Sequence, residues 1–149
     1  MIRKACIEDI KHIQELINHF AKLDLMLPRS LNELYENIRD YWVYIDNKEI
    51  IGSCALHVSW QDLAEIKSLA VMKKRQNKGI GTELVKACLK EAKELGAKRV
   101  FALTYNPAFF KKLGFRKLKH TDLPHKIWAE CINCPKFPNC QETAVLKIL

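Results

Sequence analysis

The run Gln76-Asn77-Lys78-Gly79-Ile80-Gly81-Thr82 lies between an apolar, strand-like segment and a long amphipathic helix, and it constrains the fold more than any other stretch. Two glycines two residues apart let the backbone turn tightly and approach a ligand without an intervening side chain. The amides of the first helical turn have no intrahelical partner, and the helix dipole adds partial positive charge there. The sequence therefore predicts a phosphate-binding site where this helix begins.

Two familiar nucleotide-binding loops do not match this spacing. In a Walker loop a Lys-Ser/Thr pair follows the second glycine directly, whereas Lys78 precedes Gly79 here. A dinucleotide-binding fingerprint needs a third glycine three residues after Gly81, and Leu84 occupies that position. Both nucleotide-binding interpretations therefore lose support, while the general phosphate interpretation stays.

Hydrophobic periodicity predicts the elements that precede this loop. Apolar residues recur at helical spacing from Ile7 to Phe20, so their common face is expected in the core. Ser30 and Glu33 form a capping-box pattern that begins a second helix. Segments rich in β-branched and aromatic residues then predict three antiparallel strands, at 42–45, 49–58 and 64–71.

The elements after the loop follow from the same signals. The helix that begins at Gly79 ends at Gly96, a residue suited to the positive φ of a helix C-terminus. A buried strand, a short helix and a last strand are predicted at 99–104, 107–113 and 144–149, with 119–141 irregular. Hairpins combined with one β-helix-β crossover favour an α/β (α+β) architecture with a mixed sheet. The length of 149 residues fits one domain, residues 1–149.

The glycine run also matches the Q/R-x-x-G-x-G/A signature of the GNAT acyltransferases. The preceding Glu65-Ile66-Lys67-Ser68-Leu69-Ala70-Val71 resembles the fourth strand of that family. This resemblance covers nearly all of Met1 to Phe115 and implies the GNAT fold, in the order β-α-α-β-β-β-α-β-α-β. It implies acetyl-CoA as co-substrate, with Leu69, Ala70 and Val71 contacting pantetheine and the acyl carbonyl, and Gln76 through Thr82 holding the pyrophosphate.

The resemblance also suggests catalytic residues. Glu65 occupies the strand position where several relatives carry a general base, although a surface glutamate paired with Lys67 is the alternative. Many relatives carry a proton-donating tyrosine where this chain has Phe110, which has no proton to donate. Tyr105 is the nearby substitute, and departure of the thiolate with help from water is the competing interpretation. Phe109 and Phe110 are expected to pack along the pantetheine arm, with core packing of at least one of them as the alternative.

The whole chain is similar to short single-domain amino-acid N-acetyltransferases of the N-acetylglutamate synthase type, through segments 27–31, 56–65 and 100–105. This implies L-glutamate as acceptor and a role in arginine biosynthesis. Because that acceptor has two carboxylates, Arg29 is the first candidate for carboxylate recognition and Lys67 the second. Another small amine or a protein N-terminus is the alternative acceptor, and a catalytically idle acyl-CoA sensor is a further alternative.

The cysteines fall into two groups. Cys6, Cys54 and Cys88 lie within apolar elements and are expected to be core residues. The others lie in a C-x-x-C pattern with a third cysteine and an upstream histidine, which would complete a tetrahedral zinc site; these are Cys131, Cys134, Cys140 and His125. Reduced thiols or a disulfide between two of these cysteines are the alternatives.

The formal net charge of +8 raises a different function, a basic nucleic-acid-binding module organised by the cysteines. Basic residues are mixed with acidic ones along the chain, which argues against nucleic acid. The basic clusters at 72–75 and 110–112 flank the predicted phosphate site, and attraction of a polyphosphate explains them. No apolar run reaches the length needed to cross a bilayer, so a cytoplasmic protein is expected. An exposed sheet edge leaves a homodimer open.

Overall fold

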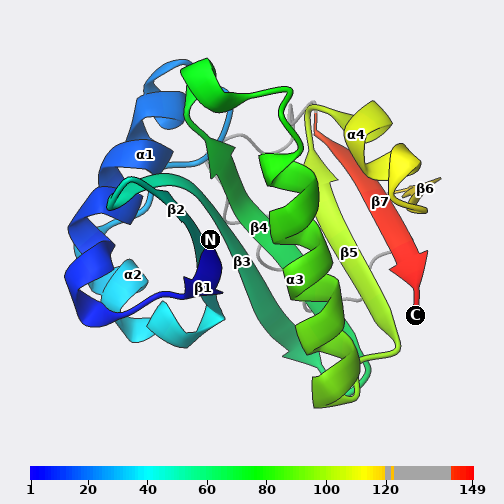
Figure 1. Ribbon diagram of the computed structural model, residues 1–149. Helices are drawn as coiled ribbons and strands as arrows, with labels where there is room; N and C mark the ends of the chain where they lie inside the picture. The colour runs from blue at the N-terminus through cyan, green and yellow to red at the C-terminus, as the bar shows by residue number, and fades with distance from the viewer. Residues whose placement is uncertain (120–121, 123–141) are drawn as a thin grey trace.

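The computed structural model describes residues 1–119, 122 and 142–149. Their strands form one mixed seven-stranded sheet in the order β1-β2-β3-β4-β5-β7-β6 (Figure 1). Only the pairing of β4 with β5 is parallel within this sheet. The strands are β1 Ile2–Lys4, β2 Tyr41–Asp46, β3 Glu49–Trp60, β4 Leu63–Val71, β5 Arg99–Thr104, β6 Arg116–Leu118 and β7 Thr143–Ile148. The mixed sheet confirms the predicted fold class.

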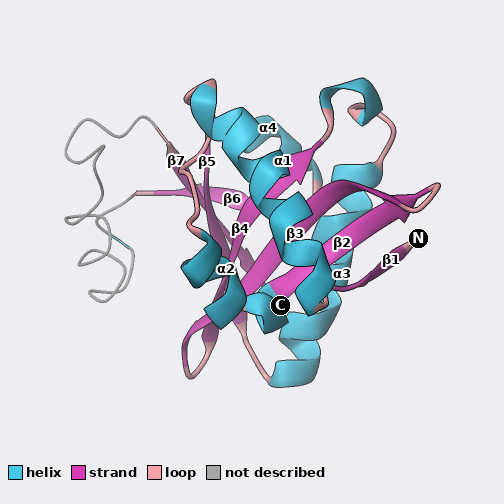
Figure 2. Cartoon of the chain, turned by 90° about the vertical axis from the view of Figure 1, so that its left-hand side faces the viewer, coloured by secondary structure: helices cyan, strands magenta, loops and turns pink. Residues whose placement is uncertain are grey.

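Helices cover both faces of the sheet. They are α1 Ile10–Lys22, α2 Leu31–Glu36, α3 Ile80–Leu95 and α4 Pro107–Lys112. Figure 2 shows α2 and α3 on opposite sides of the strands. The larger core cluster joins α3 and α4 to β3, β4 and β5, and a second joins α1 and α2 to β2 and β3. No helix of the described residues is long and apolar enough to cross a membrane.

The first helix follows the predicted periodicity, except at its start. Ile10, Ile13 and Ile17 are fully buried, but Ile7 is 67% exposed, so its predicted place in the core is wrong. Ile7 belongs to a separate 3₁₀ turn, Ile7–Asp9, that precedes α1. Cys6, which begins this turn, is exposed as well, contrary to its prediction as a core residue.

The other two described cysteines are core residues, as predicted. Cys54 on β3 and Cys88 on α3 are fully buried between the sheet and the helix. The Cys88 thiol donates a hydrogen bond to Cys54 Sγ at 3.6 Å. This hydrogen bond, followed by burial, raises the pKa of Cys88 well above its ordinary value. The Cys88 thiol is therefore held protonated, and both cysteines pack as small core residues.

The strand β6 was not predicted from the sequence. It has three residues, and it pairs antiparallel with β7 from Arg116 opposite Leu146 to Leu118 opposite Ala144. Arg116 and Lys117 are exposed, so the segment carries no apolar alternation that would reveal a strand. The segment is a strand because it pairs with β7, which is far away in the sequence.

The turn before α1 is held by a buried carboxylate. Arg3 donates two hydrogen bonds to Asp9, from Nη1 to Oδ2 at 2.6 Å and from Nη2 to Oδ1 at 3.1 Å, and the Cys6 amide donates a third at 2.8 Å. Asp9 is only 6% exposed. The hydrogen bonds from Arg3 are the main cause that lowers the pKa of Asp9 from 3.8 to about 2.

We predict that Asp9→Asn lowers the free energy of unfolding at pH 7 by about 2 kcal/mol, the value of a pKa shift of this size. The contribution of Asp9 is complete above pH 3.8 and is lost as the pH falls through about 2. Urea unfolding of both proteins as a function of pH should therefore show the difference closing at low pH. Asp62→Asn is the control, because its ion pair with Arg99 is about 40% exposed and is worth no more than about 1 kcal/mol. Equal losses in the two variants would contradict this assignment.

Candidate active site

The site begins where β4 and β5 separate. Their parallel register covers only Leu63–Glu65 on β4 and Arg99–Phe101 on β5. Both strands continue beyond this register, and Figure 1 shows them spreading apart toward their C-terminal ends. The separation opens the sheet, so that backbone groups of both strands become available to a ligand.

A β-bulge at Ser68 accompanies the separation. Ser53 pairs with Ala70 and Ala55 with Lys67, so β4 uses one residue more than β3 over this stretch. Ser68 has φ 56°, a left-handed conformation that is uncommon for serine. It is held there by the Tyr41 hydroxyl, which donates to Ser68 Oγ at 3.3 Å. A bulge changes the direction of a strand locally, and this one redirects the backbone of β4 at the opening.

A cavity of about 590 Å³ lies at the opening, a size typical of small-molecule sites. Of the described residues that the sequence predicts for the site, all but one line this cavity. Those that line it are Arg29, Glu65, Lys67, Leu69, Ala70, Val71, Gln76, Asn77, Gly79, Ile80, Gly81, Thr82, Tyr105 and Phe110. Lys78 is the predicted residue that does not contribute to the lining.

The loop before α3 has the geometry expected of an anion site. Gly79 has φ 83° and is the N-cap of α3. The first intrahelical hydrogen bond runs from the Glu83 amide to the Gly79 carbonyl at 3.0 Å, so the amides of residues 80–82 precede the helical ladder. Gln76 Nε2 donates to the carbonyl of Val71 at 3.0 Å and ties the loop to the end of β4. Strand, loop and helix start therefore form one connected wall.

Two cations of the predicted basic clusters reach this cavity. Arg75 lines it while its Nη2 donates to Asp46 Oδ2 at 2.6 Å, and Lys112 lines it from α4. The sequence alone marks each cluster as a whole and does not single out these two members. The ion pair with Asp46, which lies in the hairpin between β2 and β3, is a tertiary contact that local sequence does not reveal.

The two neighbouring phenylalanines have different surroundings. Phe110 is 4% exposed and packs edge-on against Phe115, at 5.1 Å between ring centroids, so it lines the cavity from within the core. Phe109 is only partly buried, and a Cβ added to Gly81 would lie 3.4 Å from its ring. Phe109 is therefore the aromatic residue in contact with the phosphate loop, and neither ring can donate a proton.

Glu65 and Tyr105 line the same cavity from adjacent strands. Glu65 is 9% exposed and is the last residue of β4 that pairs with β5, opposite Phe101. Tyr105 directly follows β5 and is 39% exposed. The strand opening thus places a buried carboxylate at its narrow end and a phenol at the C-terminal end of β5.

Arg29 enters the cavity from the loop between α1 and α2. Its side chain is 20% exposed, and Nη1 donates to Glu33 Oε1 at 3.0 Å. Among the described side chains, its Nε is the one buried polar atom without a hydrogen-bond partner. Burying such a donor without an acceptor costs about 1–3 kcal/mol of stability, and binding of an acceptor removes this cost.

The sequence analysis missed an apolar part of the same wall. Phe20, Leu25, Met26 and Leu27 line the cavity beside Arg29. The run Leu25-Met26-Leu27 is a signal that was available, because three consecutive apolar residues outside a predicted helix or strand are unusual on a solvated loop. Their place in the cavity nonetheless depends on the packing of α1 against β4.

Comparison with known proteins decides the family. Residues 7–115 match the acetyltransferase (GNAT) family. The chain belongs to this family. As a GNAT protein it is an N-acetyltransferase, which agrees with the strand opening and the amide-lined helix start.

Individual relatives support the assignment along the whole chain. An uncharacterized N-acetyltransferase of Chlorobaculum tepidum is 39% identical over 148 residues, covering 99% of this chain and 96% of the relative. An amino-acid acetyltransferase of Mycobacterium tuberculosis is 32% identical, covering 87% of this chain and 76% of the relative. The alignments therefore support an N-acetyltransferase. The name of the second relative also states that it acetylates an amino acid.

Solved structures resemble the whole described fold. A Mycobacterium tuberculosis protein crystallised in complex with CoA has a TM-score of 0.88 at 28% identity, covering 100% of this chain and 99% of the other. N-acetylglutamate synthase from Neisseria gonorrhoeae, complexed with coenzyme A and N-acetyl-glutamate, has a TM-score of 0.92 at 26% identity. This chain covers 35% of that synthase.

The predicted zinc ligands Cys131, Cys134, Cys140 and His125 lie outside the described residues. Within residues 1–119, 122 and 142–149, no three His, Cys, Asp or Glu side chains are grouped to hold a metal ion. The zinc site thus stays a prediction.

Proposed function

We propose that the protein transfers the acetyl group of acetyl-CoA to the α-amine of an amino acid, with L-glutamate as the expected acceptor. The carrying observation is that one cavity joins the amides at the start of α3, the buried carboxylate of Glu65 and the buried, unpartnered Nε of Arg29. A donor site, a base and an acceptor anchor are thereby within one enclosure.

The donor half of the cavity suits a thioester carrier that contains a diphosphate. Amides at a helix start bind phosphate, and Gly79 keeps the approach open because a Cβ there would meet no atom within 4 Å. Arg75 and Lys112 add positive charge beside the loop. The similar Mycobacterium tuberculosis structure in complex with CoA supports the same donor.

The chemistry requires a neutral amine. Glu65 accepts a proton from the ammonium group of the acceptor, and the nitrogen lone pair then attacks the thioester carbonyl carbon. Backbone amides of β4 near Leu69 and Ala70 stabilise the oxyanion as the tetrahedral intermediate forms. The carbon–sulfur bond then breaks, and the second proton of the amine passes to the thiolate of CoA through the Tyr105 hydroxyl or through water. Glu65 releases the first proton to solvent after the products leave.

The acceptor half supports a carboxylate-bearing substrate. Glu33 occupies Nη1 of Arg29, which leaves Nε, a buried donor without an acceptor, for a carboxylate that displaces the atoms covering it. Lys67 lines the same cavity and supplies a second cation for a second carboxylate. The two cations match a dicarboxylic amino acid, and the similar synthase with N-acetyl-glutamate supports glutamate.

A second candidate has a specific observation in its favour. Phe20, Leu25, Met26 and Leu27 give the wall beside Arg29 an apolar character. An apolar amino acid or a protein N-terminus would bury its side chain there, while Arg29 binds the carboxylate of the free amino acid. Initial rates with acetyl-CoA and a panel of glutamate, aspartate, glutamine, leucine, methionine and a short peptide separate the two candidates.

We predict that Gly79→Ala weakens binding of CoA by about tenfold or more, because a Cβ disfavours the positive φ that directs the loop amides. Isothermal titration calorimetry measures this affinity. Gly96→Ala is a matched control: Gly96 has φ 91° at the other end of α3, and a Cβ there also meets nothing within 4 Å. Both variants should lose about 1 kcal/mol of stability. Unchanged CoA affinity in Gly79→Ala would overturn the donor site.

Glu65→Gln is expected to lower kcat by about 100-fold, because the amide cannot accept the proton of the ammonium group. Its size is nearly that of glutamate, so the affinity for CoA should stay within about twofold of the wild type. Steady-state kinetics with glutamate, together with calorimetry for CoA, check both expectations. A kcat within a factor of three of the wild type would remove Glu65 from the mechanism.

Arg29→Gln should raise the KM for the amino-acid acceptor by about 10- to 100-fold, since a charge-assisted hydrogen bond to the carboxylate is lost. The KM for acetyl-CoA should change little. Arg39→Gln is the control, because Arg39 is exposed in the same part of the chain and does not line the cavity. If Arg29→Gln behaves like Arg39→Gln toward the acceptor, the carboxylate assignment is wrong.

A further inference from the structure

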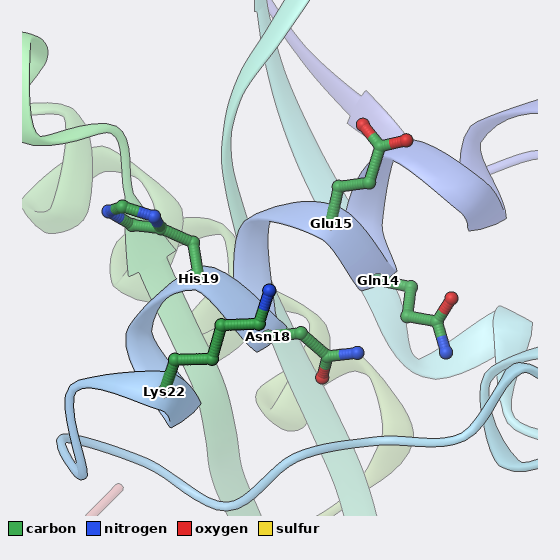
Figure 3. A pocket seen from close by; sticks show the side chains of 5 residues that line it. All are labelled: Gln14, Glu15, Asn18, His19 and Lys22. Atoms are coloured by element: carbon green, nitrogen blue, oxygen red, sulfur yellow. The ribbon is translucent and has the colours of Figure 1, made fainter.

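Two side chains of α1 form hydrogen bonds with the backbone of Arg29, one with its carbonyl and one with its amide. Gln14 Nε2 donates a hydrogen bond to the Arg29 carbonyl at 3.1 Å. The Arg29 amide donates to Asn18 Oδ1 at 3.3 Å. Because Gln14 and Asn18 are four residues apart on one helix, their side chains share a face. Figure 3 shows both amide groups on the same side of α1, toward the loop that follows Lys22.

This pair of hydrogen bonds replaces secondary structure that Arg29 itself lacks. The segment between α1 and α2 contains no helix or strand, and Asp24 within it has φ 59°. Arg29 immediately precedes Ser30, the N-cap of α2. The helix that supplies the two amides is anchored in the core by Ile13 and Ile17, both fully buried. The backbone of Arg29 is thus held in place by α1, a helix that is itself anchored in the core.

We infer that Gln14 and Asn18 are positioning residues for acceptor selection. They fix the backbone of Arg29 and thereby limit the positions that its guanidinium can take at the cavity wall. A long, flexible side chain loses less freedom on binding a ligand when its base is already held. Without the two hydrogen bonds, Arg29 would still carry its charge but would meet the carboxylate in many geometries. This inference rests on the proposed role of Arg29 as the acceptor anchor.

The polarity of the two hydrogen bonds makes the inference testable. Gln14 must donate to a carbonyl, and a glutamate at this position has no proton to donate at neutral pH. Asn18 must accept from an amide, and an aspartate accepts equally well. Gln14→Glu and Asn18→Asp therefore add the same charge to the same helix face, while only the first destroys its hydrogen bond.

The surroundings of both side chains permit this comparison. Both are half-buried, and they line an open hollow of about 400 Å³ on the outer side of α1. The other residues around this hollow are Glu15, His19 and Lys22 (Figure 3). None of the five lines the cavity of the active site. Changes at positions 14 and 18 therefore act on the acceptor through Arg29 rather than by direct contact.

Steady-state kinetics with saturating acetyl-CoA and varied glutamate test the inference. Gln14→Glu should raise the KM for glutamate by about tenfold or more, because Arg29 is then no longer held in one geometry before the acceptor binds, with kcat and the KM for acetyl-CoA within about twofold of the wild type. Asn18→Asp should leave the KM for glutamate within about threefold. In the Arg29→Gln background, Gln14→Glu should have no further effect on that KM.

Several results would overturn the inference. Equal effects of Gln14→Glu and Asn18→Asp would mean that added charge, not the hydrogen bond, is responsible. A further rise in KM when Gln14→Glu is combined with Arg29→Gln would mean that Gln14 acts elsewhere. If Gln14→Glu does not fold, Gln14→Met, which also lacks the donor, takes its place and must show the same rise. A normal KM in Arg29→Gln refutes the proposed function, whereas a rise there with a normal KM in Gln14→Glu refutes only the role of the two amides.

Discussion

The separation of β4 from β5 is the constraint on which the rest of the site depends. Parallel pairing stops at Glu65 and Phe101, although β5 continues to pair with β7 through Thr104. The edge of β5 that faces β7 is therefore paired along its whole length, while the edge that faces β4 is paired only at its start. The bulge at Ser68, held by the Tyr41 hydroxyl, turns β4 three residues beyond the point where this pairing ends. A cavity with backbone walls follows from this geometry, with Glu65 at the point where pairing ends.

In the proposed function, the half of the cavity that binds the donor and the half that binds the acceptor are lined by different kinds of chemical group. The donor half is mostly backbone: the amides at the start of α3 and the strand end from Leu69 to Val71. The acceptor half consists of side chains, Arg29 and Lys67 among apolar neighbours. Backbone walls tolerate sequence change, whereas a side-chain wall changes its chemistry with each substitution. A family can therefore keep one donor and vary the acceptor, which is why family membership supports the reaction more firmly than the substrate.

The sequence predicted what is contiguous and missed what tertiary packing brings together. The loop from Gln76 to Thr82 is one segment whose glycine spacing can be read locally, and all of its residues except Lys78 line the cavity. Arg75 reaches the cavity while paired with Asp46, 29 residues earlier, and no local pattern reveals that pairing. Likewise β6 is a strand only because β7 lies beside it. The prediction that Cys6 is a core residue was wrong because an apolar neighbourhood in sequence does not decide which side of a turn faces solvent.

If Arg29 binds the acceptor as proposed, the free protein is already prepared for that ligand. Its Nη1 is already engaged by Glu33, which is itself 42% exposed, and its backbone is held by α1. Its buried Nε lacks a partner among the described residues, at a cost of about 1–3 kcal/mol. A carboxylate that reaches Nε removes this cost, whereas a neutral amine without a carboxylate leaves it in place. Selectivity for amino acids over simple amines would then arise from an unsatisfied donor in the free protein as much as from attraction in the complex.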